Sequence, residues 1–191
     1  MLMVCAEEGT VEADLVGGAL RCPTCDGRLG PWGRARQRVI RGVGRVRPRR
    51  SRCRECRGTH VLLPDVCLLR RRDAVAVIGA ALAARAAGQG HRPIAARLGV
   101  PKDTVRGWLR RFARDAEAIR ALFSRWAFAL DPELGAVAPA GGVFADAVAV
   151  IGVAARGFVL RFGRRAVWSV VALLSGGVLL CHTSCPFPLV P

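Results

Sequence analysis

The sequence predicts a mainly α-helical protein with a small β part near its N-terminus, and three observations support this fold class. Two Cys-x-x-Cys pairs enclose short, partly alternating apolar fragments, which are typical of strands in a small sheet. Apolar residues at helical spacing follow from about residue 70. A neutral stretch of small apolar residues beyond residue 131 again shows helical spacing.

The composition indicates a folded, basic protein. Of its 191 residues, 52% are hydrophobic and 23% are charged, which excludes a wholly disordered chain. The 30 basic and 14 acidic residues give a net charge of +16. Residues 21–57 alone carry 13 arginines against Asp26 and Glu55. An excess of this kind indicates a polyanionic partner, such as nucleic acid.

Residues 1–20 form an acidic leader ahead of the first positive side chain, Arg21. No basic segment precedes an apolar run here, so a secretory signal is not expected. We therefore expect a cytoplasmic, nucleoid-associated protein. In that compartment the 8 cysteines are thiols or metal ligands rather than a disulfide framework.

The two cysteine pairs predict a structural zinc site. The expected ligands are Cys22, Cys25, Cys53 and Cys56. Two residues between ligands let the chain turn and direct both sulfurs at one ion, and two such turns complete a tetrahedral sulfur site that suits Zn²⁺. One pair could instead be a redox dithiol, or the cysteines could be incidental thiols. His60 is left out because four cysteines already fill the site.

The remaining cysteines lack this paired spacing: Cys5, Cys67, Cys181 and Cys185. The run from Cys181 to Cys185 could be drawn as a second metal site with His182. It offers only three local donors, however, so free thiols are favoured there.

The segment between and after the cysteine pairs predicts short strands. The fragments are residues 36–40, 45–47 and 59–63. Their length and partial alternation favour a small antiparallel sheet. Together with the cysteines, they predict a zinc ribbon over residues 21–66. So small a segment could not support itself without its metal.

Residues 70–125 predict a trihelical helix-turn-helix domain. Apolar residues spaced for a first helix run from Val75 to Ala86, and Gly88-Gln89-Gly90 ends it. Pro93 suits the first turn of a short second helix that Gly99 closes. A third helix then runs from Lys102 through Phe112.

The third helix has an apolar face and a basic, polar face. Val105, Trp108, Leu109 and Phe112 lie at i, i+3, i+4 and i+7. A basic helix after a short glycine turn suits insertion into a DNA major groove. The expected DNA-contacting residues are Arg92, Lys102, Asp103, Thr104, Arg106, Arg110 and Arg111. The alternative is a small helical core with a solvated charged face.

These motifs resemble the DNA-targeting region of bacterial insertion-sequence transposases, and also small zinc-ribbon helix-turn-helix proteins of actinobacteria. The similarity covers residues 21–125. It implies that the four paired cysteines are the metal ligands and that the helix from Lys102 to Phe112 is the recognition helix. A transposase also needs converging catalytic carboxylates, and the acids after the third helix lie in helical or linker sequence. Self-sufficient transposition is therefore not expected.

Residues 131–185 predict an α-helical tail in the form of a hairpin. A heptad-like seam comprises Phe144, Val148, Ile151, Ala155, Phe158 and Phe162. Residues 166–181 are uncharged but short for a membrane span, so a buried helix is favoured and membrane binding is not expected. The hairpin could pack on the preceding domain or form a homodimer.

Taken together, the sequence predicts an N-terminal zinc ribbon, a helix-turn-helix domain and a C-terminal helical hairpin. The expected function is non-catalytic, sequence-specific binding of double-stranded DNA, with structural Zn²⁺ and no small-molecule substrate. Two alternatives remain open. One is a truncated or two-part transposase component that acts with a separate nuclease, and the other is a membrane-tethered regulator that uses residues 166–181.

Overall fold

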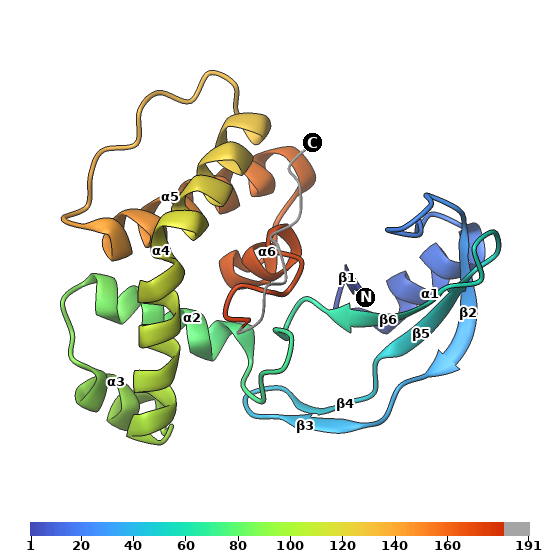
Figure 1. Ribbon diagram of the computed structural model, residues 1–191, viewed down its shortest axis with the longest axis horizontal. Helices are drawn as coiled ribbons and strands as arrows, with labels where there is room; N and C mark the ends of the chain where they lie inside the picture. The colour runs from blue at the N-terminus through green and yellow to red at the C-terminus, as the bar shows by residue number, and fades with distance from the viewer. Residues whose placement is uncertain (182–191) are drawn as a thin grey trace.

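The chain forms two lobes, one built on strands and one built on helices (Figure 1). The computed structural model describes residues 1–181, so Cys185 and the predicted end of the tail lie outside the described residues. Six helices make up about 48% of the described chain, beside a small mixed sheet. This confirms the prediction of a mainly helical protein with a small β part.

The β lobe contains a four-stranded sheet in the order β1-β6-β5-β2 and a separate two-stranded hairpin, β3-β4. The strands are β1 (Leu2–Val4), β2 (Leu29–Arg34), β3 (Arg38–Ile40), β4 (Gly44–Val46), β5 (Arg49–Cys53) and β6 (Thr59–Pro64). β5 pairs antiparallel with both β2 and β6, whereas β1 runs parallel to β6. The antiparallel pairing predicted within residues 21–66 is confirmed, and the leader adds a parallel edge strand that was not predicted.

The acidic leader is part of the β lobe. Its helix α1 (Glu8–Gly17) buries Val11 and Leu15 against a small core that includes Leu29 and Leu62. Two carboxylates of α1 pair with arginines of the sheet: Glu8 with Arg34, and Glu12 with Arg49. The leader therefore covers the sheet with apolar side chains and also neutralises part of its charge.

The helical lobe begins with three helices around one core. They are α2 (Val75–Ala86), α3 (His91–Leu98) and α4 (Lys102–Leu130). Residues 99–101 separate α3 from α4. The helix predicted from Lys102 to Phe112 continues to Leu130, since no Pro or Gly after Gly107 interrupts it before the Asp131-Pro132 pair. Its further turns bury Ile119 and Phe123.

The tail packs on α4 of the same chain. Its helices are α5 (Val143–Phe162) and α6 (Val167–Leu174). The rings of Phe112 and Phe144 lie 4.7 Å apart, and Trp126 donates its indole N–H to the carbonyl of Leu174 at 3.1 Å. Large apolar side chains at the end of α5, Leu160 and Phe162, stay exposed. The homodimer predicted through these helices remains a prediction.

The buried face of α5 differs from the predicted heptad seam. Ile151 and Ala155 are buried as expected, but Phe162 is 62% exposed. The other fully packed positions are small or branched: Ala147, Val150, Ala154 and Gly157. Small side chains let two helix backbones approach closely, so they mark the contact with α4 better than the large residues do.

Among the described residues, one helix is long and apolar enough to cross a membrane by length and composition alone. This is α5, and 28% of its apolar window is buried inside the molecule. The segment considered for a span from the sequence, residues 166–181, contains only the eight-residue helix α6. A helix of that length cannot cross a bilayer, which needs about 20 residues.

The linker between the lobes, residues 65–74, is held by the tail. Asp65 is buried and forms an ion pair with Arg165 at 2.5 Å. Arg71 donates to the carbonyl of Leu180, and the backbone N–H of Leu69 donates to the carbonyl of Gly177 at 2.8 Å. The tail thus fixes the connection between the two lobes.

Two glycines in the helical lobe differ in the space around them, so we expect their substitution by alanine to have opposite effects on the free energy of unfolding. A Cβ at Gly79 of α2 would lie 2.0 Å from the Trp168 ring, whereas a Cβ at Gly152 of α5 would meet nothing within 4 Å. Overpacking should make Gly79→Ala lower the free energy of unfolding by about 1–3 kcal/mol. Gly152→Ala should raise it by up to about 1 kcal/mol, because alanine favours the helix. Urea denaturation measures both, and a Gly79→Ala protein as stable as the wild type would contradict the packing.

Candidate metal centre and basic surface

Two turns of the same form carry the paired cysteines. In the first, the N–H of Asp26 donates to the carbonyl of Cys22 at 2.9 Å, and the N–H of Cys22 donates to the carbonyl of Gly27 at 2.8 Å. In the second, the N–H of Cys53 donates to the carbonyl of Gly58 at 2.9 Å. Asp26 and Arg57 hold equivalent places with φ values of 57° and 62°. Each turn therefore bends the chain back so that both of its sulfurs face one point.

The four predicted ligands converge. All Sγ atoms of Cys22, Cys25, Cys53 and Cys56 lie within 4.8 Å of one another. The Sγ atoms of Cys22 and Cys56 are 3.7 Å apart, and those of Cys25 and Cys53 are 3.5 Å apart. A tetrahedral zinc site with Zn–S bonds of about 2.3 Å has edges of about 3.8 Å. The cluster has the ligand type and spacing of a metal site such as zinc.

The glycines that close the turns are functional residues that the sequence reasoning missed. A Cβ at Gly27 would lie 2.9 Å from the Sγ of Cys53, and a Cβ at Gly58 would lie 3.3 Å from the Sγ of Cys56. A residue other than glycine at position 27 would displace the Sγ of Cys53. The signal was present in the sequence, since Cys-x-x-Cys-x-Gly occurs twice.

The pKa values of the two buried thiols of the cluster are shifted in opposite directions. The backbone N–H of Thr24 lowers the pKa of Cys22 to about 6, because it donates to the sulfur and stabilises the thiolate. Burial raises the pKa of Cys53 to about 12. A cation shared by both sulfurs would bind the thiolate of Cys22 and replace the proton of Cys53, and its charge would offset the cost of burying these thiolates.

His60, which the sequence analysis left out of the ligand set, lies beside the cluster. Its Nε2 is 3.4 Å from the Sγ of Cys22, and its Nδ1 is 3.4 Å from the N-terminal amino group. The histidine is buried on β6. It thus contacts a cysteine of the cluster from outside, in the position of a residue that orients a ligand.

The other described cysteines lie apart from the cluster and form no disulfide. Cys5 and Cys181 are half-buried, and Cys67 is buried. Burial raises the pKa of Cys67 to about 11, so this thiol stays protonated near neutral pH. These positions agree with free thiols.

The residues predicted to contact DNA lie on α3 and the first turns of α4. Five are exposed: Arg92, Lys102, Asp103, Arg106 and Arg110. Thr104 and Arg111 are half-buried. On the opposite side of α4, Val105, Trp108, Leu109 and Phe112 are buried in the core. Arg92 and Lys102 line a hollow at the turn between the two helices.

A depression joins the first turns of α4 to the other lobe. Thr104, Gly107 and Arg111 line one side of it. Its other walls come from the β3-β4 hairpin and the linker, through Arg41, Arg70, Arg71 and Arg72. The linker arginines also line an adjoining depression with Arg36 and Arg38. We call these six arginines of the hairpin and linker the basic surface.

Like charges crowd within the basic surface. Burial and the nearby charge of Arg111 lower the pKa of Arg71. Two carboxylates of the depression offset part of the charge, which are Asp103 and Asp73, and Asp73 pairs with Arg41 at 2.8 Å. The remaining repulsion would be relieved by an external anion bound in the depression.

Comparison with known proteins shows the family to which the chain is similar. A model of the family described as a domain of unknown function (DUF6431) matches residues 22–117, just over half of the chain. The match starts at the first cysteine of the cluster and ends inside α4. No curated protein and no solved structure matches the chain.

The cysteine cluster predicts that metal removal will unfold the β lobe selectively. We expect one zinc ion per chain by mass spectrometry of metals. Chelation, or the substitution Cys53→Ser, should abolish amide protection across residues 21–66 in hydrogen exchange, because metal binding supplies the folding free energy of so small a segment. The helices α2 to α4 should stay protected.

The matched control for this experiment is Cys5→Ser, which removes a thiol outside the cluster. This variant should keep both its zinc and its protection. Full protection of residues 21–66 after complete metal removal would contradict a structural metal.

Proposed function

The chain belongs to the family described as a domain of unknown function (DUF6431), and we propose that it is a non-catalytic, sequence-specific DNA-binding protein. One observation carries this proposal. The first turns of α4 line the same depression as four arginines of the basic surface, which are Arg41 of the hairpin and Arg70, Arg71 and Arg72 of the linker. A DNA duplex needs this combination, with a helix that reaches base edges and cations beside it for the phosphates.

In this proposal α3 and α4 form the helix-turn-helix, and α4 is the recognition helix. The turn of residues 99–101 is short, and the N-terminal end of α4 is exposed. The exposed side chains there can hydrogen-bond in a major groove, where arginine recognises guanine and Lys102 reaches bases or phosphates. Arg106 and Arg110 are one turn apart on this face and are the principal candidates for base contacts.

The basic surface supplies the phosphate contacts. Arg70 and Arg72 are exposed at the lip of the depression, on the short connection into α2. Arg36, Arg38 and Arg41 extend the same surface along the hairpin. Phosphate contacts of this kind set the register of a protein on the duplex without reading its sequence.

The metal has a structural role in this proposal, as the core of a zinc ribbon. Its ligands flank strands β2 and β5, and the β3-β4 hairpin is the connection between those strands. Closing the cysteine cluster would therefore hold β2 and β5 together at one end, and the chain that carries Arg36, Arg38 and Arg41 leaves from their other end. Zinc would act on DNA binding through the placement of these arginines rather than through chemistry of its own.

The basic surface predicts a specific change in salt dependence. Duplexes selected from a random pool by the full-length protein should bind less tightly as salt rises, with a linear relation between log K and log salt concentration. Arg72→Gln should reduce the magnitude of that slope by about 0.9 and weaken all duplexes alike, because one phosphate contact is lost.

Arg125→Gln is the matched control, since Arg125 is exposed on the C-terminal half of α4. It removes the same charge and should leave the slope unchanged. Binding that does not respond to salt, or equal effects of the two variants, would contradict the proposed surface.

Substitution of Arg106 should change both the affinity for DNA and the base preference. Arg106→Ala should cost about 1–3 kcal/mol of binding to the selected duplex and relax the preference at one base position, because a bidentate contact to a guanine is lost. Repeating the selection with the variant measures this preference. An unchanged preference with uniformly weaker binding would assign Arg106 to a phosphate.

A further inference from the structure

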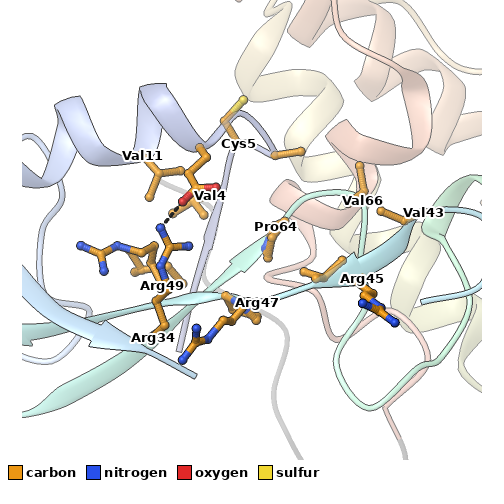
Figure 2. A pocket seen from close by; sticks show the side chains of 15 residues that line it. Val4, Cys5, Val11, Arg34, Val43, Arg45, Arg47, Arg49, Pro64 and Val66 are labelled. Carbon is orange, nitrogen blue, oxygen red and sulfur yellow. Dashed lines mark hydrogen bonds and ion pairs between the residues drawn. The ribbon is translucent and has the colours of Figure 1, made fainter. Parts of the chain in front are cut away.

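A pocket of about 280 Å³ opens in the β lobe, between the leader and strand β4 (Figure 2). The end of β1 and the start of α1 form one wall, through Val4, Cys5 and Val11. The opposite wall is the hairpin and the chain that follows it, from Val43 to Arg49. The pocket lies away from α4, and none of its lining residues belongs to the basic surface.

The inside of the pocket is apolar. Val4, Val11 and Leu62 are buried side chains of the sheet core that reach the pocket. Pro64 and Val66 complete this surface and are half-buried (Figure 2). Branched side chains and a proline offer a ligand contact area but no hydrogen-bond partner, so this part of the pocket suits a hydrocarbon group.

The rim of the pocket is cationic. Arg34 and Arg49 line it, but both are paired with carboxylates of α1. Arg45 and Arg47 also line it, and neither guanidinium has an ion-pair or hydrogen-bond partner within residues 1–181. These two guanidinium groups lie at different sides of the rim (Figure 2), and an anionic group at either side would find an arginine without a competing internal partner.

We propose that this pocket binds a small monocarboxylate whose body is a hydrocarbon chain or ring. The carboxylate would pair with Arg45 or Arg47, and the hydrocarbon would lie on Val4, Val11 and Pro64. A dry cavity of about 150 Å³ accommodates benzene, so 280 Å³ suits a ligand of about ten non-hydrogen atoms. The apolar interior makes nucleic acid a poor occupant. The inference is independent of DNA binding.

Octanoate is the probe, since it has ten non-hydrogen atoms and one charge. Isothermal titration calorimetry with the zinc-loaded, full-length protein should give one site per chain. The combined substitution of Arg45→Gln and Arg47→Gln should weaken octanoate binding at least tenfold, because a hydrogen bond to a charged group contributes at least that factor. Binding of 1-octanol should be unaffected by the same change. Val43→Trp, which places a large side chain at the mouth, should weaken both ligands.

Arg36→Gln with Arg38→Gln is the matched control. These arginines lie at the other strand of the hairpin, outside the pocket, and their loss changes the net charge equally. Octanoate should bind this variant as it binds the wild type. Equal weakening in both double variants would show non-specific attraction to a cationic protein and would overturn the proposal, as would the absence of saturable binding to the wild type.

Cys5 gives a second, local readout. Cys5 is half-buried and is one of the residues that line the pocket, whereas the half-buried Cys181 is not. Saturating octanoate should slow alkylation of Cys5 by iodoacetamide at least tenfold, measured by peptide mass spectrometry, and leave Cys181 unchanged. Unprotected Cys5 under octanoate saturation would place the ligand elsewhere and overturn the assignment. Neither the calorimetry nor the alkylation experiment involves DNA. A negative result in either one would therefore not contradict the proposed DNA binding.

Discussion

The β lobe depends on the convergence of four cysteine sulfurs. Its apolar core is small, and two of the residues in that core are Cys22 and Cys53 themselves. A core of this size cannot offset the conformational entropy of some sixty ordered residues, so a further attraction must hold the strands. The shared geometry of the two turns supplies the place for it. Strands β2 and β5 meet at this point, and the arginine-bearing hairpin connects their far ends, where Arg41 also forms backbone hydrogen bonds with Arg72 and Ala74 of the linker.

The second constraint is the docking of the tail on the linker. The linker is short and carries Arg70, Arg71 and Arg72, which lie between the lobes. It is held from the tail by the Asp65–Arg165 ion pair and by backbone bonds near Gly177. Burial raises the pKa of the Asp65 carboxyl although Arg165 opposes this shift, so the ion pair offsets part of the cost of burying Asp65 and fixes the position of the linker. The tail does not line the depression beside α4, but it holds the linker whose arginines do.

Local sequence signals predicted much of this architecture. The cysteine spacing marked the cluster, and the helical periodicity marked α2, α3 and the start of α4. The missed elements had weak local patterns. β5 reads Arg-Arg-Ser-Arg-Cys, which is not apolar, and it is a strand because β2 and β6 lie on both sides of it. β1 has only three residues, and its parallel pairing with β6 spans nearly the whole lobe in sequence. Contacts this distant leave no periodicity to detect. The pocket beside Arg45 and Arg47 arises from the same long-range packing.

The ion pairs of the leader also have a consequence for the molecule as a whole. Glu8 and Glu12 of α1 compensate Arg34 of β2 and Arg49 of β5, whereas the arginines of the hairpin and linker mostly lack such compensation. Positive charge is therefore distributed unevenly, and an uneven charge distribution has a dipole moment in addition to its net charge. In the field of an extended polyanion, such a dipole experiences a torque that turns its uncompensated end toward the polymer before contact. An acidic segment at the start of a basic protein can in this way favour a productive orientation on encounter.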